Sequence, residues 1–87
     1  MAGELLYSED ADHALTALEV SAPADYERLA AALVDFETDL GGVRWKRRRY
    51  ARPPVFGFLV SAPADTYLIL WSSVKDAAII EYVGPDI

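Results

Sequence analysis

The apolar residues in the first 40 positions recur with the period of a helix. A short apolar stretch, Glu4–Tyr7, comes first, and Ser8 after it can cap a helix by accepting a hydrogen bond from an early backbone N–H. The residues that follow at helical spacing are Ala11, Ala14, Leu15 and Leu18. We therefore predict a strand at the edge of a sheet over Glu4–Tyr7 and a short helix that ends near Glu19.

A second helix is predicted by a clearer pattern. Ser21 is a candidate cap and Pro23 suits the first turn, where a missing N–H costs nothing. Apolar residues then line up on one face, while the acids Glu27, Asp35, Glu37 and Asp39 fall elsewhere; the apolar set is Tyr26, Leu29, Leu33, Phe36 and Leu40. Gly41-Gly42 is expected to end this helix.

After Gly42 the period changes to two, and β-branched and aromatic residues become frequent. We predict four strands, joined by hairpin turns at 62–65 and 73–76: Val43–Tyr50, Val55–Ser61, Thr66–Ser72 and Ala77–Val83. Thr66–Ser72 is apolar on both faces, which is typical of a central strand. The expected fold is α+β, one domain over 1–87, with a short N-terminal strand and two helices packed on an antiparallel sheet of about four strands.

The pentapeptide Ser-Ala-Pro-Ala-Asp occurs twice, at Ser21–Asp25 and Ser61–Asp65. The first copy precedes a predicted helix and the second a predicted strand. We interpret the two copies as shared turn chemistry and not as an internal structural repeat.

The composition of the chain excludes several classes of protein and of functional site. The chain has 87 residues, of which 53% are hydrophobic, 25% are charged and none is Cys, so thiolate chemistry and Cys-ligated metals are excluded. No signal peptide and no apolar run of about 20 residues is present, so we expect a cytoplasmic protein without a membrane anchor. No nucleotide-binding loop or metal-spaced cluster occurs, and we predict neither a cofactor nor a metal site. His13 is expected to be a solvated surface residue.

Charge is segregated along the chain. The net charge is −6, and residues 1–42 hold ten acids against one base, Arg28. Residues 43–87 hold seven bases against four acids, and six of the bases lie between Arg44 and Arg52. On a strand, Arg44, Lys46, Arg48 and Tyr50 share one side, and the other side holds Val43, Trp45, Arg47 and Arg49. Val43 and Trp45 mark this second side as the one that faces the helices. Three interpretations stay open: this basic row binds nucleic acid or an acidic partner, it balances the acidic helices, or it protects an edge strand from aggregation.

The order of a short strand, two helices and antiparallel strands resembles the RelE/ParE toxin superfamily of toxin–antitoxin systems. Leu5–Ser8 followed by Ala11, Leu15 and Leu18 is similar to the opening strand and helix of that family, and an Arg-rich strand follows the second helix in both. The resemblance implies a cognate antitoxin as partner. It also implies a target, which is ribosome-bound mRNA for the ribonuclease members and gyrase for others.

The resemblance also assigns site residues. The implied catalytic set is Lys46, Arg48, Tyr50 and Tyr82, and the implied binding residues are Arg44, Arg52 and Trp45. The cations would hold phosphates, and a tyrosine would orient or exchange a proton with a 2′-hydroxyl. The chain departs from the family in its acidity and in a C-terminal segment without a catalytic base, so whether it is an enzyme stays open. The alternative is a non-catalytic interaction module or a small homodimeric accessory subunit that uses an edge strand or the aromatic residues Trp45, Phe56, Phe58 and Trp71.

Overall fold

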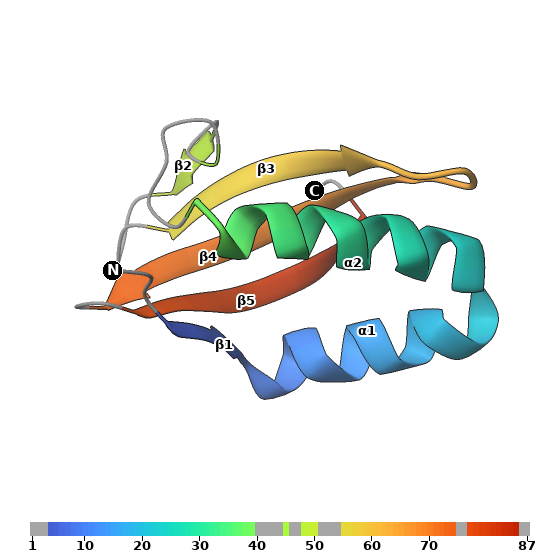
Figure 1. The fold of residues 1–87 in the computed structure, drawn as a ribbon, viewed down its shortest axis with the longest axis horizontal. Helices are drawn as coiled ribbons and strands as arrows, with labels where there is room; N and C mark the ends of the chain where they lie inside the picture. The colour runs from blue at the N-terminus through green and yellow to red at the C-terminus, as the bar shows by residue number, and fades with distance from the viewer. Residues whose placement is uncertain (1–3, 40–44, 46–47, 51–54, 75–76, 86–87) are drawn as a thin grey trace.

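Two helices cover one face of a five-stranded sheet in this computed structural model, which describes residues 4–39, 45, 48–50, 55–74 and 77–85 (Figure 1). Along the chain the elements are β1 (Glu4–Tyr7), α1 (Glu9–Ser21), α2 (Pro23–Glu37), β2 (Arg48–Tyr50), β3 (Val55–Ser61), β4 (Thr66–Val74) and β5 (Ala77–Pro85). In space the strands are ordered β1-β5-β4-β3-β2. The predicted α+β class is confirmed, and β4 is the central strand, as expected.

The four strands after the helices form the antiparallel sheet that the sequence predicted, and the N-terminal strand makes the complete sheet mixed. β2, β3, β4 and β5 pair antiparallel with their neighbours, but β1 pairs parallel with β5, from Glu4 opposite Ala77 to Tyr7 opposite Ile80. The pair of helices brings the chain back across the sheet after β1, and such a return allows parallel pairing. The prediction that Glu4–Tyr7 lies at a sheet edge is confirmed.

The capping prediction is confirmed for the first helix and wrong for the second. The Ser8 hydroxyl accepts a hydrogen bond from the Ala11 N–H at 3.1 Å and so caps α1. Ser21, by contrast, is the last residue of α1 and donates to the Ala17 carbonyl at 2.9 Å. The N-cap of α2 is Ala22, whose side chain makes no capping bond, and Pro23 occupies the first turn as predicted.

The predicted faces of the second helix are correct over the described residues. Leu29, Leu33 and Phe36 are buried, and the four acids of the other face are exposed. α2 ends at Glu37, and the predicted Leu40 contact and Gly41-Gly42 stop lie outside the described residues.

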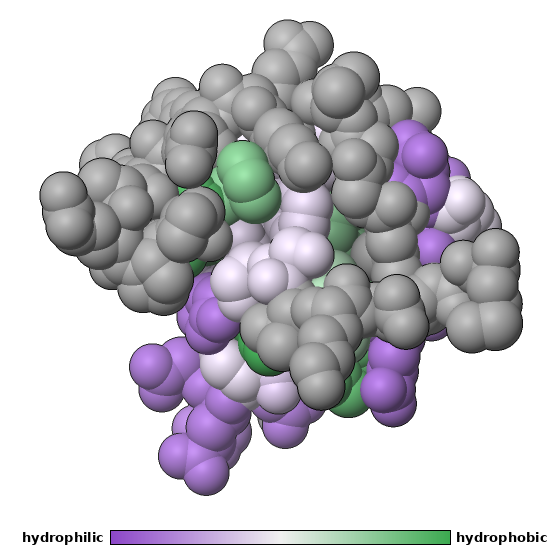
Figure 2. Space-filling view, turned by 90° about the vertical axis from the view of Figure 1, so that its left-hand side faces the viewer, coloured by the Kyte–Doolittle hydropathy of each residue, from purple (hydrophilic) through white to green (hydrophobic). Residues whose placement is uncertain are grey.

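Seen from the end where β1 begins, hydrophilic side chains form the lower and right-hand margins of the described surface, with small hydrophobic areas between them (Figure 2).

The observed strands differ most from the predicted ones in the basic stretch between positions 44 and 52. β3 has the expected bounds, and β4 and β5 each run two residues further, so the second hairpin turn is shorter than 73–76. The described part of the predicted strand Val43–Tyr50 is a strand only over Arg48–Tyr50, and Trp45 has a 3₁₀ backbone. Trp45 does face the helices, as the alternation predicted, because its ring packs against Phe36 of α2.

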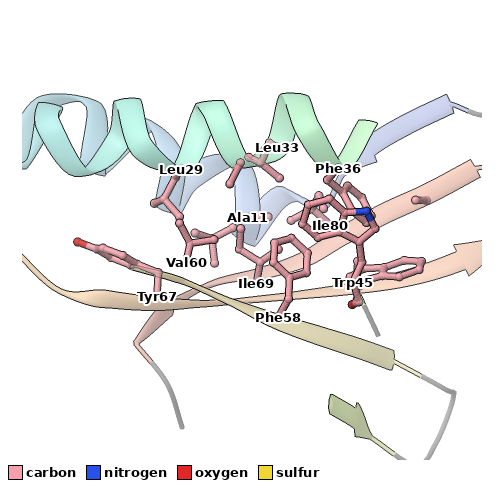
Figure 3. Close-up of a cluster of buried hydrophobic side chains, with 14 residues drawn as sticks. Ala11, Leu29, Leu33, Phe36, Trp45, Phe58, Val60, Tyr67, Ile69 and Ile80 are labelled. Carbon is pink, nitrogen blue, oxygen red and sulfur yellow. Dashed lines mark hydrogen bonds between the residues drawn. The ribbon is translucent and has the colours of Figure 1, made fainter. Parts of the chain in front are cut away.

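An aromatic cluster forms one end of the core between helix and sheet. The Phe36 ring lies 5.4 Å from Trp45, 5.6 Å from Phe58 and 5.0 Å from Trp71 between centroids. The Trp71 indole N–H donates to the Trp45 carbonyl at 2.9 Å, which fixes the chain after α2 to the central strand. In Figure 3 the side chains of α2 pack against apolar side chains of β3, β4 and β5 along the whole length of the cluster.

The two copies of the pentapeptide meet in space. The first forms the junction between α1 and α2, the second forms the β3–β4 hairpin turn, and both turns lie at the same end of the molecule (Figure 1). Asp25, only 1% exposed, accepts the Ala64 N–H at 3.0 Å and the Tyr67 hydroxyl at 2.7 Å. The buried carboxylate of the first copy therefore fixes the hairpin that the second copy forms.

Because of this contact, we expect the stability of the fold to decrease at alkaline pH. The hydrogen bond to Asp25, followed by burial, raises the pKa of Tyr67 from 10.0 to about 12. The folded protein thus retains a proton that the unfolded chain loses above pH 10, so the stabilisation is complete below pH 10 and is lost as pH rises through about 12. We expect the free energy of unfolding to fall over this range more steeply in the parent than in Tyr67→Phe. Urea titrations of both proteins from pH 8 to 12 test this, and identical slopes would contradict it.

Candidate functional site

Both helices pack on the same face of the sheet, and no described helix lies on the other. Tyr67, Ile69 and Trp71 of β4 join the helix-side core, so the alternating residues Leu68 and Leu70 belong to the opposite side. We call this opposite surface the second face. By register, its described positions are Glu4, Leu6, Arg48, Tyr50, Val55, Gly57, Leu59, Ser61, Thr66, Leu68, Leu70, Ser72, Val74, Ala77, Ile79, Glu81, Tyr82 and Gly84.

The second face is largely apolar and only partly buried. Leu6 and Leu59 are 41% and 45% exposed, and Leu70, Ile79 and Tyr82 are half-buried. Leu68 is fully buried, so the prediction that β4 is covered on both sides holds at that position. The side chains of Leu68 and Leu70 lie over Gly57, where a Cβ atom would come within 2.9 Å of a Leu70 methyl group. Because no described helix covers this apolar face, we treat it as the candidate binding surface.

One row of paired residues crosses the second face from the edge strand β2 to β5. Arg48 pairs with Gly57, Gly57 with Leu70, and Leu70 with Tyr82. Paired residues share a face of a sheet, and neighbouring strands are about 4.8 Å apart, so the backbone positions of Arg48 and Tyr82 are roughly 14 Å apart on this face. Tyr50 pairs with Val55 in the next position of the same face. The register thus places three positions of the predicted set, 48, 50 and 82, on one face of the sheet.

A β-bulge at Glu81 adds polar groups to this row. Trp71 pairs with Ile80 and Leu70 with Tyr82, so Glu81 has no partner residue on β4. Ile80 and Val83 both belong to the helix-side core, and the two residues between them therefore share the second face. The Glu81 carboxylate accepts the Ser72 hydroxyl at 2.6 Å, and the Glu81 carbonyl accepts the Ser8 hydroxyl at 3.1 Å. This site was not predicted from the sequence, although the three-residue spacing of the apolar residues Ile80 and Val83 in a strand is a signal of a bulge.

Tyr82 is held in a defined position beside the bulge. Its ring lies over Gly84, where a Cβ atom would come within 2.6 Å of the Tyr82 hydroxyl oxygen. The hydroxyl donates to the Pro85 carbonyl at 2.9 Å. Its oxygen can still accept a hydrogen bond, but its proton is engaged, and an acid–base role would require this bond to break.

The remaining predicted residues fall into two groups. Arg44, Lys46 and Arg52 lie outside the described residues. Trp45 is 8% exposed and is enclosed by Phe36 and Phe58, so its ring is a core element and is not available to stack on a base. The aromatic surface suggested for an interaction module is also wrong, because Phe58 and Trp71 are buried and Phe56 is partly buried against the same core.

The described part of the chain contains no group of three or more His, Asp or Glu residues arranged to hold a metal ion. His13 is exposed on α1. Among the described residues, no helix combines the length and the apolar character needed to cross a membrane.

Comparisons of this chain with protein-family models, with curated proteins and with solved structures gave no match.

Proposed function

We propose that this chain is the toxin of a RelE/ParE-like toxin–antitoxin pair and that it binds its target through the second face. The observation that carries the proposal is the row across the sheet, which aligns Arg48 with Tyr82 on the face that the helices leave uncovered. A cation at one end and a fixed phenol at the other suit a phosphate-bearing or acidic target. The apolar residues between and beside them would hold an antitoxin segment that covers the face.

The geometry favours a toxin that blocks its target over one that cleaves it. Two of the acid–base groups on the second face, Glu81 and Tyr82, are each engaged in a hydrogen bond within the protein. Nucleic acid and gyrase both remain targets of this proposal, and the experiment separates them.

The test is growth of a host that expresses the chain under tight induction. We expect arrest with the parent, relief in Arg48→Ala, and no relief in the matched variant Arg28→Ala. Arg28 is an exposed arginine on α2, on the helix side of the sheet. Total RNA and DNA supercoiling are examined after induction: cleaved transcripts indicate a ribonuclease, and altered supercoiling indicates a gyrase poison. Equal arrest by the parent and Arg48→Ala, or normal growth at good soluble expression, would overturn the proposal.

A non-catalytic interaction module is the second candidate, and the exposure of Leu6 and Leu59 on the second face favours it. Such a module would self-associate through this apolar surface. In that case sedimentation should show an oligomer for the parent and a monomer for Leu59→Glu. A strictly monomeric parent would count against the homodimeric form.

A further inference from the structure

A groove runs between the two helices, on the side of the sheet away from the second face. Its volume is about 320 Å³, which lies at the lower end of the range for small-molecule sites. The α1 wall includes Asp12, Leu15 and Glu19, the α2 wall includes Tyr26, Leu33 and Glu37, and Tyr7 of β1 closes one end. Figure 1 shows the two helices side by side, with β1 leading into the left-hand end of α1.

Apolar and acidic groups alternate along this groove. On α1, Asp12 and Glu19 flank Leu15 at helical spacing, and the helix rise places the two acids about 10 Å apart along the axis. On α2, Glu37 lies near the end of the helix that adjoins Tyr7, and Leu33 lies one turn before it. The groove thus has an apolar floor with a carboxylate toward each end.

All charged side chains among the described lining residues of the groove are negative. Three carboxylates line it, and no Lys, Arg or His is among its described lining residues. Burial, followed by the nearby Glu37 and Tyr26, raises the pKa of Tyr7, which shows that its phenol shares this environment with Glu37. A cation placed here would meet carboxylates, two tyrosine rings and no competing base.

We propose that the groove binds a linear aliphatic polyamine. Its ammonium groups would pair with the carboxylates toward the two ends, Glu19 at one and Glu37 with Asp12 at the other. Its methylene chain would lie over Leu15 and Leu33, and the faces of Tyr7 and Tyr26 would contact the cationic groups. A metal ion fits less well, because the described acids are spread along the groove and form no cluster that could coordinate one.

The experiment is a calorimetric titration of the whole chain with spermidine at two salt concentrations. The variant is Glu19→Gln combined with Glu37→Gln, which removes one groove carboxylate from each helix. Its matched control is Glu9→Gln combined with Glu27→Gln, which removes the same charge from exposed positions of the same helices outside the groove lining. We expect about a tenfold loss of affinity in the groove variant and less than a twofold change in the control.

Three outcomes would overturn the inference. Equal weakening in both variants would mean that spermidine acts only as a counterion to the acidic surface. If Mg²⁺ at the same concentration of positive charge displaced spermidine, spermidine would again be acting only as a counterion. Self-association of the parent that the groove variant abolishes would assign the groove to a second copy of the chain. The result is independent of the proposed toxin function, because the titration involves neither the second face nor host growth.

Discussion

Replacement of Phe36 with alanine is expected to remove most of the stability of this protein. Phe36 is fully buried, and its ring contacts those of Trp45, Phe58 and Trp71. Truncation of a buried Phe costs about 3–5 kcal/mol, from lost apolar burial and from the cavity that remains. A small domain has a free energy of unfolding of roughly 5–15 kcal/mol, so the variant should be marginally folded at best. Urea denaturation followed by tryptophan fluorescence measures the change.

Val34→Ala is the matched control for this prediction. Val34 lies two residues before Phe36 on the same helix but is 59% exposed. Its truncation should change the free energy of unfolding by about 0.5 kcal/mol or less. If the two variants were equally stable, α2 would not be packed on the sheet through the Phe36 face.

Loss of the Asp25 carboxylate should have the second largest effect. Asp25→Ala removes the acceptor of the Tyr67 hydroxyl, which is buried, and of the Ala64 N–H, which is part-buried. Hydrogen bonds to a charged group contribute about 1.5–3 kcal/mol each, and buried polar groups left unpaired add their desolvation cost. We expect a loss of roughly 3–5 kcal/mol, together with faster hydrogen exchange in the β3–β4 hairpin, measured by denaturation and by amide exchange.

The repeated pentapeptide supplies the control. Asp65 occupies the same position in the second copy, but it is exposed, and among the described residues its carboxylate accepts only the N–H of the next residue, Thr66. Asp65→Ala should therefore cost about 1 kcal/mol or less. Equal losses in the two variants would contradict the assignment of Asp25 as the link between the two turns.

The candidate site was predictable only in part. Two-residue alternation assigned positions 48 and 50 to the side away from the helices, and the pairing with Gly57 and Val55 places them there. The alternation did not predict that Arg48 shares a row with Tyr82, because the register between four strands depends on turns and on the bulge at Glu81. Trp45 was misjudged as a binding residue because an aromatic ring beside basic residues has the same sequence pattern in a core and on a surface.

The sequence by itself determined the class of fold, the existence and order of the elements, and the buried face of α2. These follow from local periodicity, since each helix or strand must turn its apolar residues to one side. Only the tertiary structure decided the parallel pairing of β1 with β5, the burial of Asp25 and the meeting of its turn with the identical pentapeptide in the hairpin. Such features join residues far apart in the chain, and their partners depend on how complete elements pack. Two copies of Ser-Ala-Pro-Ala-Asp therefore have one local chemistry but place a buried carboxylate in one case and an exposed one in the other.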